Sequence, residues 1–255
     1  MTKEILGSLE LNRIYQMDCL EGMKLIPDRS IDMILCDLPY GTTRNNWDVV
    51  IDLNKLWTQY ERIIKDSGAI VLTAQTPFDK ILGSSNLKLL KYEWIWVKKR
   101  PTGHLNSKKM PMKAHENILV FYKKTPVYNP QGLIKKDIPT VRKGRRGNGQ
   151  NYGKSDKDAI QKFENYPKDI LQFPQDSKGI HPTQKPVALF EYLIKTYTNE
   201  NDVVLDNCMG SGTTAVSATL NNRKWLGFET DKEYIKLANE RLEHINLELD
   251  LINLS

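Results

Sequence analysis

The stretch VVLDNCMGSGTTAVSA, residues 203–218, decides the fold because it combines a strand, a glycine-rich turn and the start of a helix. The apolar Val203–Leu205 predicts a buried strand, and Thr213–Asn221 predicts a helix. Glycines at such a turn let the backbone approach a ligand closely. The turn lacks the third glycine of a dinucleotide fingerprint and the lysine of a phosphate loop, so it favours neither a nicotinamide cofactor nor ATP.

The strand that follows this unit points to the kind of cofactor. Lys224–Phe228 is a predicted strand that ends at Glu229. An acid about 20 residues beyond a glycine-rich turn can bind the hydroxyls of a ribose. A ribose site without a pyrophosphate site fits adenosine carried by S-adenosylmethionine, which is therefore the expected cofactor.

The rest of the chain alternates predicted strands with predicted helices. Strands are expected at Arg13–Met17, Ile31–Cys36, Ala69–Thr73, Tyr92–Val97, Ile118–Tyr122, Val203–Leu205 and Lys224–Phe228. Helices are expected at Cys19–Ile26, Leu53–Lys65, Pro77–Leu89, Val187–Tyr197, Thr213–Asn221 and Lys232–Ile245. This alternation is typical of βαβ units around a parallel sheet, so the predicted class is α/β. The alternation fails at residues 123–180, where we predict an insert.

A second motif, Asp37-Leu38-Pro39-Tyr40, ends the predicted strand Ile31–Cys36. Asp37 offers a carboxylate acceptor, Pro39 stiffens the turn, and Tyr40 offers a flat face for stacking. Together these groups suit a planar base that carries an amino group. An ordinary junction between a strand and a turn would explain the same residues, because Asp and Pro are common in turns.

Four predicted strands are followed by an acid. These acids are Asp18, Asp37, Asp206 and Glu229. In open α/β sheets, ligands bind at the carboxyl ends of the strands, so four acids there predict one shared site. Each of them could instead cap the helix that follows its strand, since Asp is a favoured N-cap residue.

Positive charge is concentrated in the middle of the chain. Residues 98–154 hold 15 Lys and Arg against 2 acidic residues, although the whole chain has a formal net charge of +6. Such a concentration suits a nucleic-acid backbone, because contacts with phosphates release counterions. A solvated charged loop is the alternative. In the insert we expect Lys143, Arg145 and Arg146 to contact DNA phosphates, with some of them reading guanine edges.

The composition indicates the compartment, the redox state of the cysteines and the absence of a structural metal. Cys19, Cys36 and Cys208 lie far apart in the sequence without CxxC spacing, and their odd number argues against a disulfide framework. The four histidines show no metal-ligand spacing. No apolar stretch reaches the roughly 18 residues of a spanning helix, and the first residues do not form a secretory signal. We therefore expect a reduced cytoplasmic protein without a structural metal.

Three motifs together resemble one enzyme family. Asp37–Tyr40, LDNCMGSGTT at residues 205–214 and HPTQKP at residues 181–186 are similar to those of the β group of DNA amino-methyltransferases, which methylate adenine N6 or cytosine N4. The resemblance covers residues 12–242 except about 123–179. It implies a Rossmann-like, S-adenosylmethionine-dependent methyltransferase fold with permuted motif order. The catalytic half would be residues 1–122, the basic target-recognition insert 123–180, and the cofactor half 181–255.

The resemblance also implies roles for individual residues. The catalytic motif would be Asp37, Leu38, Pro39 and Tyr40, and the methionine end of the cofactor would be held by Asp206, Gly210, Gly212 and Thr213. Glu229 would take the ribose hydroxyls, Asp18 the adenine amino group, and Lys185 would lie near the cofactor carboxylate. The partner would be double-stranded DNA, and the chain would form a homodimer as family members often do. The stretch His115–Asn117 is interpreted as structural.

This chain departs from the family pattern at two places. Leu38 replaces the usual proline of the catalytic motif, but its backbone carbonyl can still accept from the target amino group. Asn207 and Cys208 replace the proline and phenylalanine that usually follow the cofactor aspartate, so a stacking ring is lost. Neither departure removes a charged group.

The predicted function is methylation of adenine N6 in DNA, because Asp at the head of the catalytic motif leans towards adenine in this family. Methylation of cytosine N4 is the alternative. Two further classes stay open at this point: a nucleic-acid-binding module without activity, and a methyltransferase acting on RNA or a small molecule. The basic segment disfavours a small substrate.

Overall fold

The computed structural model describes residues 3–41, 50–143, 157–175 and 184–253. The chain divides into two compact units: residues 1–129 with 169–255 form the first, and Pro130–Lys168 form the second. Within the described ranges, no helix has both the length and the apolar composition that crossing a bilayer requires.

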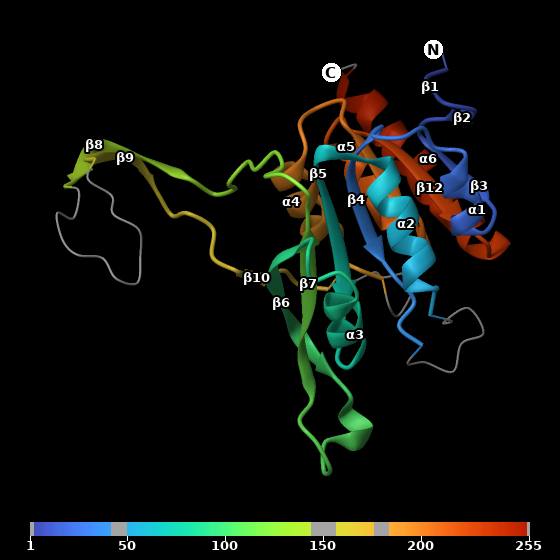
Figure 1. The fold of residues 1–255 in the computed structure, drawn as a ribbon, viewed down its shortest axis with the longest axis horizontal. Helices are drawn as coiled ribbons and strands as arrows, with labels where there is room; N and C mark the ends of the chain where they lie inside the picture. Colours follow the sequence, from blue (N-terminus) through green and yellow to red (C-terminus); the bar gives the residue numbers. More distant parts are fainter. Residues whose placement is uncertain (1–2, 42–49, 144–156, 176–183, 254–255) are drawn as a thin grey trace. The chain divides into compact units, whose positions relative to one another are not determined.

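An eight-stranded sheet forms the centre of the first unit (Figure 1). Its strands are β3 (Arg13–Gln16), β4 (Ile31–Asp37), β5 (Ile64–Ala74), β6 (Leu90–Thr102), β7 (Lys113–Phe121), β10 (Ile170–Gln172), β11 (Val203–Asp206) and β12 (Lys224–Glu229). The order across the sheet is β10-β6-β7-β5-β4-β11-β12-β3. The α/β class and the alternating pattern predicted from the sequence are confirmed.

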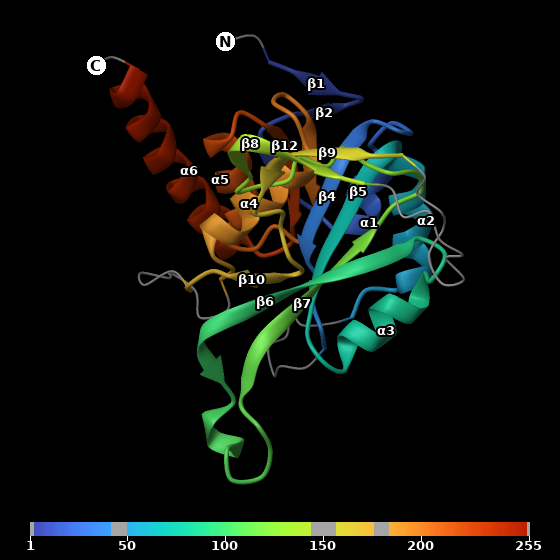
Figure 2. The ribbon, with the colours of Figure 1, turned by 90° about the vertical axis from the view of Figure 1, so that its left-hand side faces the viewer.

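The alternating pattern predicted a parallel sheet, but the observed sheet is mixed. Strand β7 runs antiparallel to both of its neighbours, β5 and β6, while the other pairs are parallel. Antiparallel neighbours need no helical crossover. Here β6 turns back into β7 through an extended hairpin with a short 3-10 helix, η1 (His104–Asn106), near its tip (Figure 2).

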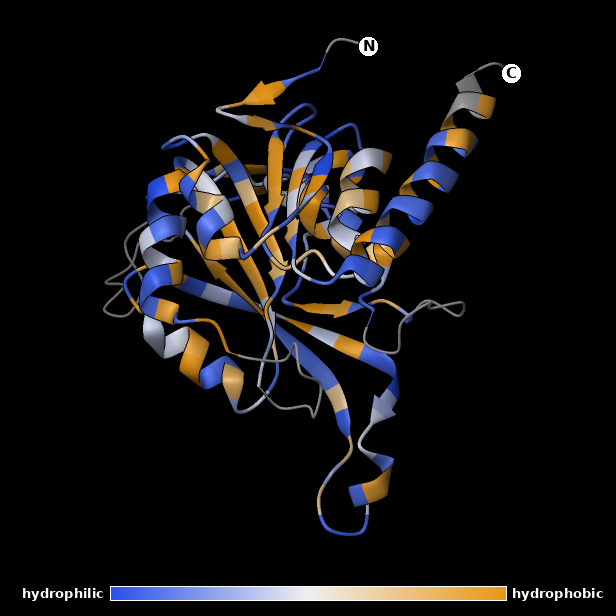
Figure 3. Ribbon diagram, turned by 90° about the vertical axis from the view of Figure 1, so that its right-hand side faces the viewer, coloured by the Kyte–Doolittle hydropathy of each residue, from blue (hydrophilic) through white to orange (hydrophobic). Residues whose placement is uncertain are grey.

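Helices cover both faces of the sheet. Helices α1 (Cys19–Lys24), α2 (Leu53–Ile63) and α3 (Phe78–Ser85) pack on one face, and α4 (Val187–Tyr197), α5 (Thr213–Leu220) and α6 (Lys232–Asn253) pack on the other. A hydrophobic core lies on each face of the sheet, and alternate residues of β4 point into the two cores. Ile34 and Cys36 face the core under α1, α2 and α3, and Met33 and Leu35 face the core under α4, α5 and α6. Because both faces are covered, the central strands are apolar almost throughout (Figure 3).

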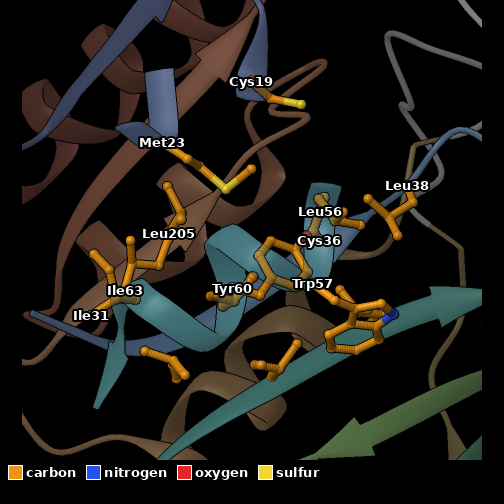
Figure 4. Packing of buried hydrophobic residues seen from close by; sticks show 14 of the residues in the cluster. Cys19, Met23, Ile31, Cys36, Leu38, Leu56, Trp57, Tyr60, Ile63 and Leu205 are labelled. Carbon is orange, nitrogen blue, oxygen red and sulfur yellow. The ribbon is translucent and has the colours of Figure 1, made fainter. Parts of the chain in front are cut away.

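Local signals account for where the helices begin. Asp52 caps α2 by accepting from the amides of Asn54 and Lys55, which are donors that the first turn leaves unpaired. Leu56 and Tyr60 then lie one turn apart and are buried against the sheet (Figure 4). The helix was predicted to reach Lys65, but it ends earlier because Ile64 adopts an extended conformation and starts β5.

Several short elements were not predicted. Strands β1 (Ile5–Leu6) and β2 (Leu9–Glu10) form a small hairpin in the first unit. In the second unit, β8 (Ile134–Arg142) and β9 (Ala159–Glu164) pair antiparallel. These two strands are mostly exposed, so they lack the buried face that makes a strand readable from sequence. The target-recognition role of residues 123–180 stays a prediction.

Candidate active site

The strand order reverses between β4 and β11. From β4 the chain crosses through α2 to β5 on one side, and from β11 it crosses through α5 to β12 on the other. Ligands of open α/β sheets bind at the carboxyl ends of the strands beside such a reversal. Asp37 is the last residue of β4 and Asp206 is the last residue of β11, so the two acids flank this point.

The four acids singled out in the sequence lie at the same edge of the sheet. Strands β4, β11, β12 and β3 are consecutive and parallel, and Asp37, Asp206 and Glu229 end the first three of them. Asp18 lies just beyond β3, where it caps α1. Four strands that are scattered along the chain therefore bring their acids to one rim.

Asp37 has both carboxylate oxygens engaged. The Nζ of Lys185 lies 2.5 Å from Oδ2, and the hydroxyl of Tyr40 donates to Oδ1 at 2.6 Å. Thr73, the register partner of Asp37 on β5, also donates to Oδ1 through its hydroxyl. The Asp37 side chain is 32% exposed, so it is held firmly and yet remains accessible.

Lys185 lies between two carboxylates. Its Nζ is 3.3 Å from Oε2 of Glu116 as well as 2.5 Å from Asp37, and its side chain is only 7% exposed. Burial lowers the pKa of Lys185, but the charges of Asp37 and Glu116 outweigh burial and raise it above its ordinary value. The side chain is therefore a fixed cation. The structure places its Nζ on the catalytic-motif aspartate, and its position near the cofactor carboxylate stays a prediction.

The other residues of the motif anchor the turn. The side chain of Leu38 is buried in the core beside α2 (Figure 4). The ring of Tyr40 stacks on Phe78, with centroids 5.4 Å apart and planes at 30°. Burial and the charge of Asp37 raise the pKa of the Tyr40 hydroxyl well above its ordinary value, so the hydroxyl stays a donor. Stacking of Tyr40 on a target base stays a prediction, as does the role of Pro39.

Glycine is needed for different structural reasons at two positions of the turn after β11. Gly210 has φ +50°, and a Cβ there would meet no atom of the described residues closer than 3.9 Å, which leaves the backbone room to approach a ligand. Gly212 has φ +82°, and a Cβ there would come within 2.7 Å of the Cβ of Ala238 on α6. Gly212 is therefore required for helix packing, and Gly210 is the better candidate for close approach to a cofactor.

Asp206 is buried at 3% exposure beneath this turn. Its Oδ2 accepts from the Thr214 hydroxyl at 2.5 Å, and its Oδ1 accepts from the Cys208 amide at 3.0 Å. Burial raises the pKa of Asp206 to about 6, although both hydrogen bonds pull it down. Thr213, at the start of α5, is also buried. The carboxylate is thus costly to ionise in this structure and would gain from a cationic ligand.

Glu229 and Asp18 are both held by backbone amides. Glu229 accepts from the amides of Gly210, Thr230 and Asp231 at 2.8, 2.8 and 2.9 Å. The Thr230 hydroxyl also donates to Oε1, at 3.4 Å, so Oε1 is fully used. Oε2 accepts only the Gly210 amide among the described residues and keeps capacity for a ligand hydroxyl. Asp18 accepts from the first turn of α1 through Oδ1 alone. For Asp18 the structure therefore shows the helix N-cap, and its contact with the cofactor adenine stays a prediction.

The departures from the family pattern form their own packing. The Tyr60 hydroxyl of α2 donates to Oδ1 of Asn207 at 2.5 Å, which fixes the turn where the family has proline. The three cysteines, distant in sequence, gather here, where the thiols of Cys19 and Cys36 interact with that of Cys208. Contact with Cys208 and burial raise the pKa of Cys19, and burial raises the pKa of Cys36 and Cys208, so the thiols stay protonated at neutral pH.

The predicted DNA contacts belong to the stretch of chain that forms the second unit. Lys143 is exposed at the end of the described part of the second unit, and Arg145 and Arg146 lie outside the described residues. His181, Pro182 and Thr183 of the HPTQKP motif also lie outside them.

Several members of the site were not predicted from the sequence. Thr73 sits in an apolar strand and gave no local signal. Glu116 was read as structural, yet its side chain is 5% exposed and pairs with Lys185 and with Lys98. Only the sheet order, which puts β7 two strands from β4, could have pointed to Glu116.

The N6/N4 DNA methylase family model matches residues 31–240, which include both the Asp37 motif and the glycine turn. The chain belongs to this family. Among curated relatives, the DNA adenine methyltransferase YhdJ of Escherichia coli (strain K12) is 29% identical over 251 residues, covering 92% of this chain and 83% of the relative.

Solved structures agree with this family assignment. The crystal structure of an M1.HpyAVI complex with S-adenosylmethionine is 26% identical, with a TM-score of 0.62 and coverage of 90% of this chain and 98% of that one. The cytosine-N4-specific PvuII DNA methyltransferase shares the fold at 17% identity, with a TM-score of 0.69 and coverage of 89% and 85%. The predicted Rossmann-like methyltransferase fold is thus confirmed, and β4 precedes β11 in the permuted order.

Proposed function

We propose that this DNA methyltransferase transfers a methyl group from S-adenosylmethionine to N6 of an adenine that has left the DNA duplex. The observation that carries the proposal is the position of Asp37. It is a well-oriented, accessible carboxylate at the reversal of strand order, beside the acids proposed to hold the cofactor. Methylation of cytosine N4 is the second candidate, favoured by the similarity in fold to the PvuII enzyme.

The donor set of the site fits S-adenosylmethionine. The cofactor supplies an electrophilic methyl group on a positively charged sulfonium, and it also carries an ammonium and two ribose hydroxyls. Asp206 offers a buried carboxylate for the ammonium, and Glu229 keeps acceptor capacity for the ribose. Gly210 gives the backbone room to approach. Gly212 and Thr213 contribute by shaping the turn and the start of α5.

The chemistry needs acceptors for the amino hydrogens of the target. The exocyclic nitrogen is a poor nucleophile because its lone pair is delocalised into the ring. Asp37 and the carbonyl of Leu38 would each accept one hydrogen and favour a tetrahedral nitrogen. The lone pair then forms the N–C bond while the S–C bond breaks and its electrons stay on sulfur. Asp37 stabilises the positive charge that develops on nitrogen, whose proton finally leaves to solvent.

The target base must leave the duplex for this geometry. Its amino group cannot be reached in line while the base is stacked between neighbours. Tyr40 is proposed to stack on the extruded base, a contact worth about 1–3 kcal/mol for nucleic-acid bases. Phe78 already supports one face of the Tyr40 ring, which keeps the ring in place.

The choice of adenine rests on Asp37 at the head of the motif and on the relative described as a DNA adenine methyltransferase. The test is to incubate the purified protein with labelled S-adenosylmethionine and unmethylated genomic DNA, then to digest the DNA and analyse the nucleosides by mass spectrometry. N6-methyladenine is expected. N4-methylcytosine would keep the mechanism and overturn the base. Methylation of RNA in preference to DNA would overturn the substrate class.

We propose that DNA phosphates contact the basic arm, defined as residues 99–113 of the β6–β7 hairpin. Its five cations are Lys99, Arg100, Lys108, Lys109 and Lys113; all are exposed, and the arm has no acidic residue. Because β6 is parallel to β5 and β4, the arm extends from the edge at which Asp37 lies (Figure 2). Lys143, Arg145 and Arg146 are proposed to add phosphate contacts from the second unit.

The basic arm gives a quantitative prediction. Replacing Lys108 and Lys109 with glutamine should weaken DNA binding. The plot of log association constant against log [salt] has a negative slope, and its magnitude should fall by about 2, one for each lost phosphate contact. The control replaces Lys24 and Lys195, which lie in the last turns of α1 and α4, at the opposite ends of the strands from Asp37. Fluorescence anisotropy between low and high salt measures both slopes. An unchanged slope in the arm variant would remove the arm from the DNA interface.

A further inference from the structure

A chain of four alternating charges, three of them buried, runs from the catalytic motif to the base of the basic arm. The Nζ of Lys185 contacts Oδ2 of Asp37 at 2.5 Å and Oε2 of Glu116 at 3.3 Å. Oε1 of Glu116 in turn pairs with the Nζ of Lys98 at 2.5 Å and accepts from the Gln75 amide at 2.9 Å. Lys98, Glu116 and Lys185 are each less than 8% exposed at the side chain.

These groups come from separate elements that meet at the carboxyl edge of β4. Asp37 ends β4, Glu116 lies on β7, Lys98 lies on β6 and Lys185 precedes α4. Burying three charges is costly unless each one is paired, and here each cation touches a carboxylate and each carboxylate touches a cation.

We propose that Glu116 is a positioning residue for methyl transfer: it anchors Lys185, and Lys185 in turn fixes the catalytic carboxylate of Asp37. The inference rests on the proposed function and adds to it a residue outside the three motifs. A lysine side chain is a flexible four-carbon stem, so a single contact would leave its ammonium free to change position. Glu116 supplies the second contact, at 3.3 Å from the Lys185 ammonium.

The consequence for Asp37 is a division of labour between its two oxygens. Lys185 occupies Oδ2, whereas Oδ1 accepts only the hydroxyls of Tyr40 and Thr73 among the described residues. Thr73 is fully buried, so its hydroxyl would lose its acceptor at a cost, and Oδ1 is the fixed oxygen. Oδ2 has one donor among the described residues and therefore keeps an acceptor site for the target amino group.

Glu116 also leaves part of the negative charge of Asp37 unbalanced by Lys185. A lysine paired with Asp37 alone would neutralise the charge that must stabilise the developing positive nitrogen. Because Lys185 is shared with Glu116, part of its charge is balanced elsewhere. The raised pKa of Lys185, which both carboxylates cause, is consistent with this sharing.

The test separates positioning from stability with a double variant. Glu116→Gln removes one charge from the chain and leaves the buried Lys98 unpaired, so some stability is lost for reasons unrelated to catalysis. Lys98→Met combined with Glu116→Gln removes both charges and should recover that stability. Asp66→Asn, which breaks the exposed pair with Lys124, is the control. Methyl transfer to DNA is followed in a single turnover at saturating cofactor, together with cofactor affinity and thermal unfolding.

We expect Glu116→Gln to slow methyl transfer about 10- to 100-fold, the loss that misplacement of a reacting group by about 1 Å can cause. Cofactor affinity should change little, and Asp66→Asn should behave like the wild type. The double variant should regain thermal stability but stay slow. If the double variant regains the wild-type rate, Glu116 merely neutralises Lys98 and the proposal is wrong.

A second readout does not depend on activity. Crystal structures of the wild type and of Glu116→Gln should show Lys185 in contact with Oδ2 of Asp37 in the first and displaced from it in the second. An undisplaced Lys185 would refute the positioning role even if the rate fell. A wild-type protein that methylates no nucleic acid would refute the proposed function instead, and the two structures would still decide whether Glu116 orients Asp37.

Discussion

Replacing Asp37 with alanine should slow methyl transfer about 100- to 1,000-fold while leaving the binding of S-adenosylmethionine nearly intact. The carboxylate is proposed to act on the target amino group, and its main effect is on charge that develops in the transition state. Loss of one such preorganised group costs about 10²–10³-fold in rate. Lys185 would keep Glu116 as its partner, so the variant should remain folded. Single-turnover transfer to DNA and calorimetric titration with the cofactor measure the two effects.

A second substitution separates charge from position. Asp37→Asn keeps the shape and one acceptor oxygen but removes the charge, so a loss close to that of alanine would assign the effect to charge. Asp28→Ala, which breaks an exposed ion pair with Arg62, serves as the control. Turnover of Asp37→Ala within about threefold of the wild type would contradict the catalytic assignment, because a group that acts in the transition state cannot be lost at so small a cost.

Replacing Asp206 with asparagine should make the protein more stable at alkaline pH and weaken cofactor binding. The pKa of Asp206 is about 6 in the folded state, against an ordinary value of 3.8, because the carboxyl is buried. The protonated form is thus favoured on folding. The protonated Asp206 carboxyl stabilises the folded state fully below pH 3.8, and this stabilisation is lost as the pH rises through 6. Above pH 6 the carboxylate costs roughly 3 kcal/mol, an order-of-magnitude figure that Asp206→Asn should recover.

The same substitution should cost affinity for the cofactor. A hydrogen bond to a charged group is worth about 1.5–3 kcal/mol, so we expect binding about 10- to 100-fold weaker. Wild-type affinity should rise between pH 5 and 7 as Asp206 ionises, and the affinity of the variant should not follow that rise. Denaturant unfolding at pH 4 and pH 8, with calorimetry at the same values, tests both statements. A variant less stable than the wild type at pH 8 would contradict them.

Much of the fold was readable because its signals are local. The six predicted helices and seven predicted strands each correspond to an element of the structure, since hydrophobic periodicity and caps act within a few residues. Strand direction was harder to read. The antiparallel β7 looks like any other apolar run, and its orientation follows from the hairpin that joins it to β6. The exposed strands β8 and β9 carry no apolar periodicity that could have shown them.

Sequence by itself determined the family, the order of the catalytic and cofactor motifs, and the acids that end the strands. Each of these depends on residues that are neighbours along the chain. Only the tertiary structure decided which groups surround Asp37. Lys185 is 148 positions away from it, and Glu116 reaches Lys185 because β7 folds back into the sheet beside β5. Such contacts depend on strand order and on pairing between buried charges, and neither leaves a pattern in a single sequence.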